Sequence, residues 1–239
     1  MNRPDNFTTI PFDAQHLDRV VIRRAIFNAL QENMHLFKGA LLDVGCGKMP
    51  YRKFITDQEL VNSYTGLDIE AAIEYEAGVL PDITWDGITM PFGEDHFETA
   101  LATEVLEHCY EPQLLLAEIY RVLKPGGMFF YTVPFLWPLH EVPYDAYRYT
   151  PFSLEKLLTE AGFELVAIKA HGGWHASMAQ MIGLWVNRSP MGHLRRSVYQ
   201  RLAKPWMKYL LKKDQHFDKS FKEGQMITGL YGIAFKPNI

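Results

Sequence analysis

Apolar residues along this chain fall into two patterns that alternate. Short apolar runs predict buried strands at 40–44, 64–69, 97–103, 128–133, 163–169 and 226–235, with a shorter apolar–polar stretch at 82–86. Helical spacing of apolar positions predicts helices over 13–36, from about 50, over 111–123 and over 152–161. Strands that alternate with helices in this way are typical of a mostly parallel sheet with helices on both faces.

A glycine-rich turn follows the first predicted strand. That strand ends in Asp43-Val44-Gly45-Cys46-Gly47, and the next one ends in Asp68. Glycines let the backbone approach a ligand, and a carboxylate at the end of the second strand accepts the hydroxyls of a ribose. The pair predicts a site for a nucleoside-type cofactor, with a tight turn that binds no ligand as the alternative.

The glycine spacing narrows the choice of cofactor. A dinucleotide fingerprint has a third glycine, which helps to seat a pyrophosphate on the helix N-terminus. Here Lys48-Met49-Pro50 follows Gly47, and that glycine is missing. The loop therefore favours a cofactor without a pyrophosphate. S-adenosylmethionine, which has an adenine, a ribose and an amino acid tail, meets this requirement.

These elements predict a doubly wound, Rossmann-like α/β fold with a seven-stranded, mostly parallel sheet. The connection between strands 163–169 and 226–235 is far longer than such a fold needs, which predicts an inserted helical lid before the last strand. Pro205 is expected to begin a new helix there. The single domain expected over 1–239 comprises an N-terminal helical cap at 1–37, a cofactor-binding core at 38–170, a basic helical insertion at 171–225 and the last strand at 226–239.

Composition limits the compartment and the partners. The net charge of −4 argues against general affinity for nucleic acid. The two cysteines, Cys46 and Cys109, predict no disulfide framework and fit a reducing compartment. Residues 1–5 lack an apolar signal core, and no uncharged apolar run of about 18 residues occurs, so we expect a cytoplasmic protein. No Cys/His cluster has zinc spacing, and no metal site is predicted.

Four blocks in order resemble class I S-adenosylmethionine-dependent methyltransferases of the broad type 11 group. They are the glycine loop at 41–47, Gly-Leu-Asp at 66–68, the stretch from 90 to 108, and Arg-Val-Leu-Lys-Pro-Gly-Gly at 121–127. The last block is the most specific, because it recurs before the fifth strand across this superfamily. The resemblance covers about residues 38–170 and implies a methyltransferase with S-adenosylmethionine as its cofactor.

The resemblance also implies which residues hold the two ends of the cofactor. Asp43 and the loop Gly45-Cys46-Gly47 are expected at the methionine end. Thr103 and Glu104, which follow the fourth strand, are expected near the sulfonium. Residues 48–51 depart from the more glycine-rich continuation of the family, so the shape of the loop there stays open.

The nucleoside end is assigned in the same way. Asp68, with Ile69 beside it, is expected to accept both ribose hydroxyls, because a carboxylate takes two charge-assisted hydrogen bonds at once. Asp86 is expected to reach the exocyclic amine of adenine, with Gly87 beside the ring. The alternative for Asp68 and Asp86 is a solvated strand end. Glu98 stands where the family often has Asp.

The loop after the fifth strand is the expected place for chemistry, because ligands sit outside the carboxyl ends of such strands. His140 is the candidate general base, since imidazole titrates near neutral pH. Asp145 orients it or binds sugar hydroxyls, and Tyr144 is a candidate substrate contact. Arg148 either clamps a phosphate or carboxylate of the substrate or bridges Asp145 or Glu141 and holds the loop.

Three further predictions concern residues around this loop. Thr150 is expected to cap the next helix, which begins near Pro151. His171 and His175 follow the sixth strand and are candidate substrate contacts at the mouth of the site. His108 is expected to be a satisfied histidine on a helix face.

The insertion before the last strand combines apolar and basic residues. Residues 176–186 are nearly all apolar, which favours a core or dimer interface, and 188–213 hold eight basic residues and no acidic one. Three interpretations stay open: a lid whose cations attract an anionic acceptor, a helix on an anionic membrane, or a solvated face over the sheet edge. A homodimer and a peripheral position on the inner face of the membrane are therefore considered.

These observations together predict methyl transfer to a small-molecule or glycan-like acceptor, at a hydroxyl oxygen. The loop His-Glu-x-Pro-x-Asp-x-x-Arg-Tyr-Thr at 140–150 resembles a subgroup linked to cell-surface glycan and secondary-metabolite pathways. Two alternatives remain, namely methylation of a natural-product intermediate at nitrogen or carbon, and a non-catalytic protein that binds the cofactor and stabilises a partner.

Overall fold

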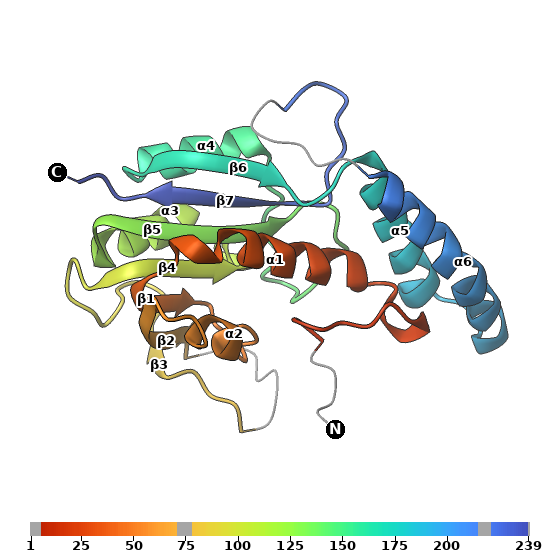
Figure 1. Ribbon diagram of the computed structural model, residues 1–239, viewed down its shortest axis with the longest axis horizontal. Coiled ribbons are helices and arrows are strands. Elements are labelled where there is room, and N and C mark those ends of the chain that lie inside the picture. The colour runs from red at the N-terminus through yellow and green to blue at the C-terminus, as the bar shows by residue number, and fades with distance from the viewer. Residues whose placement is uncertain (1–5, 71–77, 215–220, 239) are drawn as a thin grey trace.

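The computed structural model of the chain describes residues 6–70, 78–214 and 221–238. The prediction made for residues 1–5 lies outside the described residues, as do parts of the expected cap, insertion and last strand. The described part forms a central sheet flanked by helices, with a pair of helices beyond one edge (Figure 1).

The sheet has seven strands in the order β3-β2-β1-β4-β5-β7-β6. All neighbours are parallel except β7, which is antiparallel to both β5 and β6. The doubly wound, mostly parallel sheet predicted from the sequence is therefore confirmed. The strands are β1 Gly39–Val44, β2 Val61–Ile69, β3 Ile83–Trp85, β4 Phe97–Thr103, β5 Leu123–Pro134, β6 Glu164–Ala170 and β7 Gly229–Phe235.

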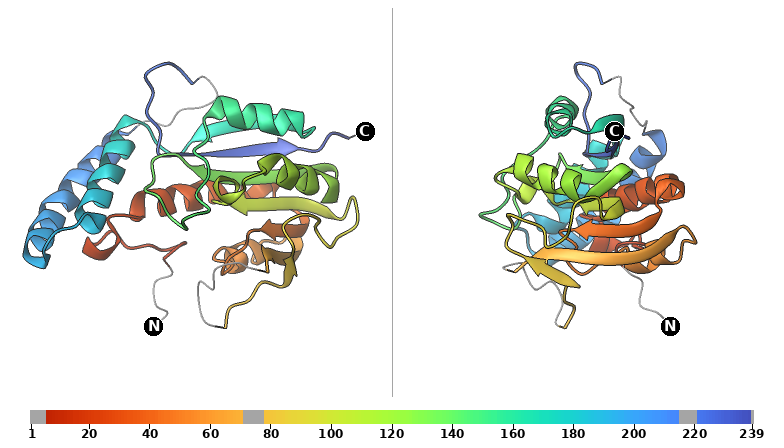
Figure 2. Two further views of the ribbon diagram at one scale, coloured as in Figure 1. Left: turned by 180° about the vertical axis from the view of Figure 1, so that it is seen from behind. Right: turned by 90° about the vertical axis from the view of Figure 1, so that its left-hand side faces the viewer.

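Helices cover both faces of this sheet (Figure 2). One face packs against α1 (Val20–Asn33) and α2 (Arg52–Thr56), which bury Ile26 and Ile55 beside β1. The other face packs against α3 (Pro112–Val122) and α4 (Pro151–Glu160) through Leu116 and Leu158. Short 3₁₀ turns at Ala14–His16 (η1), Met34–Leu36 (η2) and Leu106–His108 (η3) complete this part of the fold.

The start of α4 follows from a capping box. The Thr150 hydroxyl accepts the backbone N–H of Ser153 at 3.2 Å, and the Ser153 hydroxyl lies 3.0 Å from the backbone nitrogen of Thr150. Pro151 occupies the first helical position, where a missing N–H has no cost. The predicted cap is confirmed, and it fixes the end of the loop that runs from β5 to α4.

Two helices, α5 (Trp174–Arg188) and α6 (His193–Lys213), form a hairpin between β6 and β7. The hairpin packs on the segment that leads into α1. At Gly183 a Cβ would lie 2.0 Å from the carbonyl oxygen of Leu17, so only glycine permits this approach. The buried Asp18 carboxylate accepts Arg188 Nε at 3.0 Å and fixes the end of α5.

The prediction that Pro205 begins a helix is wrong, because Pro205 lies inside α6. The break falls earlier, between Arg188 and His193, where Ser189-Pro190 and Gly192 interrupt the chain. A proline inside a helix removes one backbone hydrogen bond. Ala203 and Met207, buried on either side of it, hold both halves of α6 against the same surface. No helix in the described part of the chain is both long enough and apolar enough to cross a membrane.

Candidate functional site

The loop after β1 has a backbone that only glycine adopts easily. Gly45 and Gly47 have φ angles of 62° and 50°, in the left-handed region that disfavours side chains. A Cβ at Gly45 would also lie 2.7 Å from Cγ2 of Val105. The left-handed backbone of this loop therefore favours glycine at both positions, whether or not a ligand approaches the loop.

Asp68 connects the end of β2 to this loop. Its Oδ2 accepts the backbone N–H of Gly47 at 2.8 Å, and its Oδ1 accepts the N–H of Ile69 at 2.9 Å. Burial raises the pKa of the Asp68 carboxyl, and these two donors act against that rise. Each carboxylate oxygen accepts more than one hydrogen bond, so Asp68 can fix the loop and still accept ribose hydroxyls.

Asp43 lies below the loop, and it is buried. Its carboxylate accepts a hydrogen bond from the Tyr64 hydroxyl on β2. Burial raises the pKa of Asp43 to about 7, while the Tyr64 hydroxyl and the Arg52 guanidinium act in the opposite direction. Asp43 does not line the cavity described next, so its expected contact with the methionine end stays a prediction.

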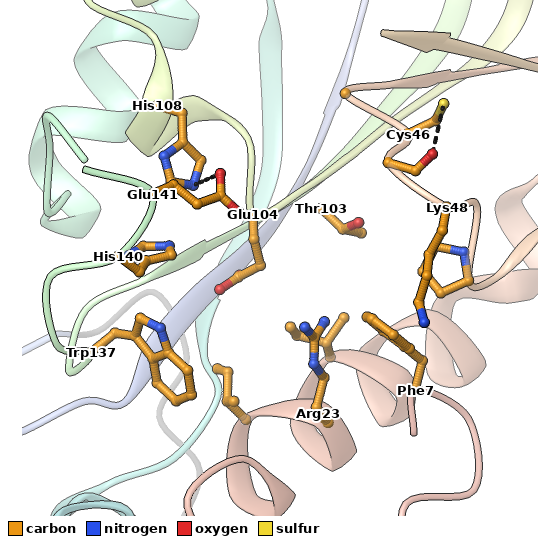
Figure 3. Close-up of a pocket in the computed structure, with 15 residues that line it drawn as sticks. Phe7, Arg23, Cys46, Lys48, Thr103, Glu104, His108, Trp137, His140 and Glu141 are labelled. Atoms are coloured by element: carbon orange, nitrogen blue, oxygen red, sulfur yellow. Dashed lines mark hydrogen bonds and ion pairs between the residues drawn. The ribbon is translucent and has the colours of Figure 1, made fainter. Parts of the chain in front are cut away.

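A cavity of about 180 Å³, open to solvent, lies over the carboxyl ends of β1 and β4. Figure 3 shows the histidines and Glu141 on one wall, the glycine loop with Lys48 on the other, and α1 contributing Arg23 between them. The lining residues are Phe7, Ile22, Arg23, Ile26, Gly45, Cys46, Gly47, Lys48, Pro50, Thr103, Glu104, His108, Trp137, His140 and Glu141.

Glu104 closes the carboxyl end of β4 at this cavity. Its φ angle is 57°, a strained value for a residue other than glycine. Its Oε1 accepts the Thr132 hydroxyl at 2.8 Å, and its backbone N–H donates to the Thr132 carbonyl at 3.0 Å. Burial raises the pKa of Glu104 to about 7, although the Thr132 hydroxyl and the Arg23 guanidinium act against the rise. The strained backbone thus aims an acidic side chain at the cavity.

His140 and His108 form the wall of the cavity opposite the glycine loop (Figure 3), and their ring centroids lie 4.7 Å apart. Nδ1 of His140 lies 3.2 Å from Asp145 Oδ2, and Nδ1 of His108 lies 3.3 Å from the carbonyl oxygen of Tyr144. Nε2 of His108 lies 3.5 Å from Glu141 Oε2. Burial lowers the pKa of His140 below 6.5, so its imidazole is neutral near pH 7.

Arg148 holds the loop from within. Its guanidinium makes a two-pronged ion pair with Asp145, with Nη2 at 2.8 Å from Oδ2, and Nη1 also donates to the carbonyl of Tyr147 at 2.8 Å. Burial acts to raise the pKa of Asp145, but Arg148 and His140 outweigh it and lower this pKa to about 2. Of the two roles predicted for Arg148, the structure shows the bridge to Asp145. Tyr144 is exposed and does not line the cavity.

The residues expected around adenine lie outside the cavity lining. Asp86 is exposed, and its Oδ1 accepts the backbone N–H groups of Ile88 at 2.9 Å and Thr89 at 3.0 Å. Gly87 has a φ angle of 82°, and its Cβ position would lie 3.7 Å from Cγ2 of Ile69. Ile69 and Gly87 are thus neighbours at the surface, and contact of these residues with adenine remains a prediction.

The structure does not bring His171 and His175 to this site. His171 is buried against Tyr231 and lines a second cavity behind α1, and His175 is exposed on α5. The reason is the strand order. Both residues follow β6, which is the edge strand and is separated from β4 by β5 and β7. Neither residue lines the cavity, and their contact with a substrate remains a prediction.

Several site residues were missed by sequence reasoning. Arg23 and Phe7 reach the cavity from the N-terminal segment, and Trp137 reaches it from the loop after β5. Glu107 is fully buried, and within the described residues neither carboxylate oxygen accepts a hydrogen bond. A charged pair, Arg23-Arg24, inside an otherwise apolar helix pattern was the available signal for Arg23.

Glu107, His108 and His140 are brought together although no metal site was predicted. One ligand atom from each lies within 4.8 Å of the others, a spacing that would allow them to share an ion. Burial raises the pKa of Glu107 well above its ordinary value, which favours the neutral carboxyl group.

The residues present suit S-adenosylmethionine. The glycine loop lines the cavity. Asp68 stands beside the loop, outside the cavity lining, and accepts its Gly47 N–H, so its contact with ribose hydroxyls remains a prediction. Glu104 offers a carboxyl group to a cation on the cavity wall. Asp68, the glycine loop and Glu104 are the groups that would face the diol, the amino acid tail and the sulfonium of this cofactor.

Comparison with known proteins shows a match to one family over part of the chain. Residues 42–131 match the family described as "Methyltransferase domain". A phthiotriol/phenolphthiotriol dimycocerosates methyltransferase of Mycobacterium tuberculosis (strain H37Rv) is 35% identical over 98 residues, which are 38% of this chain and 36% of that protein. The chain thus spans about a third of the length of the curated relatives it matches.

Solved structures share the fold at low sequence identity. A S-adenosylmethionine-dependent methyltransferase from Archaeoglobus fulgidus superposes with a TM-score of 0.56 at 16% identity, over 89% of this chain and 94% of that one. The [4+2]-cyclase SpnF superposes with a TM-score of 0.56 at 21% identity, over 90% and 81%. Residues 42–131 are therefore similar to a methyltransferase domain, and the described part of the chain has the fold of class I S-adenosylmethionine-dependent methyltransferases, as its motifs implied.

Proposed function

We propose that this chain transfers the methyl group of S-adenosylmethionine to a hydroxyl oxygen of a glycan-like acceptor, and specifically to a sugar hydroxyl on a lipid-linked or nucleotide-linked saccharide. One observation carries the proposal. His140 stands across the cavity from the glycine loop, with Nδ1 3.2 Å from Asp145 Oδ2. A carboxylate this close to the ring favours uptake of a proton from an acceptor hydroxyl by the imidazole.

The protonation states of the two residues fit this role. Burial lowers the pKa of His140, so the imidazole is neutral near pH 7 and able to accept a proton. Asp145, with a pKa of about 2, remains ionised beside it. The ionised carboxylate then stabilises the imidazolium that forms when the hydroxyl proton is taken up.

Bound S-adenosylmethionine supplies an already activated methyl group, so the protein mainly aligns the reactants and excludes water. The hydroxyl proton would pass to Nε2 of His140 as the acceptor oxygen takes up the methyl group, and the cofactor would leave as S-adenosylhomocysteine. Glu104 and the glycine loop hold the cofactor side of the cavity, while His108 and Trp137 complete the acceptor side.

The acceptor class is supported by two kinds of resemblance. The loop at 140–150 resembles a subgroup of methyltransferases linked to cell-surface glycans. The curated relatives are named for phthiotriol and phenolphthiotriol dimycocerosates. An alcohol acceptor attached to a lipid or a glycan is consistent with both, and the corresponding substrate of this chain is a proposal.

The test uses S-adenosylmethionine with a tritiated methyl group. The full chain and its His140→Gln variant are incubated with pools of lipid-linked saccharides and of nucleotide sugars. We expect tritium in an O-methyl group of one pool, identified by mass spectrometry, and a large loss of turnover in the variant. Label found only on nitrogen or carbon would refute the hydroxyl acceptor, and full turnover by the variant would refute His140 as the base.

A further inference from the structure

The hairpin of α5 and α6 exposes a row of large apolar residues on each of its helices. On α5 the exposed residues Trp174, Met178, Met181 and Trp185 recur at intervals of three and four positions, so they lie on one side of the helix. On α6 the same holds for Leu194, Val198, Leu202, Trp206 and Tyr209. The Trp185 and Tyr199 rings, 4.9 Å apart, join the two rows.

This surface is not needed to attach the hairpin to the rest of the fold. α6 buries a different row, Ala203, Met207 and Leu210, which packs with Leu17 and Val20 at the start of α1. Leu202 and Trp206 remain 64% and 53% exposed. Exposed apolar patches of this kind mark interaction sites in proteins. The exposed apolar row of α6 therefore indicates that this surface binds a partner.

The charge around the surface identifies that occupant. Residues 174–213 contain eight basic side chains and no acidic one, whereas the rest of the chain contains 16 basic and 28 acidic side chains. Arg195 and Arg201 each lie three positions from Val198, and Lys212 lies three positions from Tyr209, so these cations border the apolar row. None of these three cations forms an ion pair with a carboxylate of the described residues.

Two competing occupants are disfavoured. No residue of 174–213 contributes to the lining of the cavity described above, so the cations do not face an acceptor there. A second copy of the chain docked by the same surface would bring two basic hairpins together, and like charges repel. Trp and Leu flanked by Lys and Arg are instead the composition of helices that lie in the interface of an anionic bilayer.

We infer that the α5–α6 hairpin binds the surface of a membrane rich in anionic lipids, with its apolar row at the headgroup boundary. The hairpin projects beyond the sheet edge that carries the carboxyl ends of the parallel strands (Figures 1 and 2). The Arg188 guanidinium lies 4.9 Å from the ring centroid of Trp137, which lines the cavity. This placement would bring a lipid-linked acceptor close to the site, a consequence that rests on the proposed function.

The test measures sedimentation of the full chain with lipid vesicles, which needs no methyl transfer. Vesicles of phosphatidylglycerol and phosphatidylcholine are compared with vesicles of phosphatidylcholine alone, at low and high salt. We expect binding to the anionic vesicles that weakens as salt rises. Equal binding to both vesicle types, or binding to neither, would overturn the inference and would leave the proposed function untouched.

Matched variants locate the binding surface. Arg195→Glu with Arg201→Glu is expected to lower partitioning by about 25-fold or more, since each basic residue near an anionic surface contributes a factor of about five. Leu202→Gln with Trp206→Gln is expected to lower it about tenfold or more. Phe152→Gln on α4, at a residue also 64% exposed, serves as the control and is expected to bind like the original chain.

Two further measurements guard against misinterpretation. Calorimetry with S-adenosylmethionine is expected to give the same affinity for every variant, which shows that each still folds. Analytical ultracentrifugation is expected to show no dimer that depends on Leu202. A dimer broken by Leu202→Gln, or variants that bind anionic vesicles as well as the Phe152→Gln control, would overturn the membrane assignment.

Discussion

Replacement of Glu104 by Gln tests whether this carboxylate faces the sulfonium of the cofactor. Glu104 lines the cavity at the end of β4. Burial raises its pKa to about 7, and the Thr132 hydroxyl and the Arg23 guanidinium act against that rise. A cationic ligand favours the ionised form of a neighbouring carboxyl group. S-adenosylmethionine carries the sulfonium and S-adenosylhomocysteine does not, so only the first ligand should respond to the charge of Glu104.

The magnitude follows from the pKa. With a pKa of about 7, Glu104 is about one tenth ionised at pH 6 and about nine tenths ionised at pH 8. A unit positive charge about 6 Å away in a medium of effective dielectric constant about 20 is attracted by about 3 kcal/mol. This attraction exceeds the cost of about 1.4 kcal/mol for ionising the group at pH 6. The preference for S-adenosylmethionine over S-adenosylhomocysteine should therefore rise severalfold, up to about tenfold, between pH 6 and pH 8.

The assay is calorimetry with both ligands at pH 6, 7 and 8. The ratio of the two dissociation constants removes effects that act on both ligands, such as the titration of Asp43, whose pKa is also about 7. Glu104→Gln should abolish the pH dependence of this ratio and lower the preference for S-adenosylmethionine at pH 8. Glu94→Gln, at an exposed residue outside the cavity, is the control. A ratio that does not change with pH in the original chain would refute the placement of Glu104 beside the sulfonium.

Three other substitutions extend these tests. Asp68→Ala should weaken both ligands by about 2–3 kcal/mol in calorimetry, because it removes charge-assisted hydrogen bonds; equal affinity would exclude the ribose contact. His140→Ala should lower turnover in the methyl-transfer assay while calorimetry gives nearly the same cofactor affinity, and a matching loss of affinity would assign His140 to the cofactor. Asp43→Asn should remove a pH dependence of stability, because folding raises the pKa of Asp43 from 3.8 to about 7. The contribution of Asp43 to the unfolding free energy is fully present below about pH 4. It is lost as the pH rises to about 7, by up to about 4 kcal/mol. The unfolding free energies of the variant and the original chain are measured by urea titration at several pH values. The same change with pH in both proteins would contradict this expectation.

Local patterns were sufficient to predict most of the sheet. Strand β4 occupies 97–103 as expected, because an apolar run bounded by polar residues fixes both ends. Strand β5 begins at Leu123, earlier than the expected residue 128. The turn at 124–127 does not end the pairing, because the backbone N–H of Gly126 donates to the carbonyl of Lys236 beyond β7. Such a contact between distant segments leaves no mark on the local pattern.

The cavity was predicted only where its residues belong to a motif. The glycine loop, Glu104 and His140 were found because their positions follow strand ends. Arg23 was not found, because the apolar stripe of α1 tells which face is buried but not which part of the sheet it covers. The position of His171 outside this cavity could not be predicted for a similar reason: a strand end can be recognised locally, but the order of strands in the sheet cannot.

The charge distribution of the site also bears on the acceptor. Arg148, the cation first considered for a substrate phosphate, is paired with Asp145 and with backbone carbonyls. The wall around His140 instead presents Glu141 to the cavity, whereas the cations Arg23 and Lys48 line it away from that wall (Figure 3). A phosphate placed beside the Glu141 carboxylate would be repelled, whereas a neutral hydroxyl can donate a hydrogen bond to it. The reacting end of the acceptor is therefore expected to be an uncharged alcohol, with any phosphate of a lipid or nucleotide carrier held farther from His140.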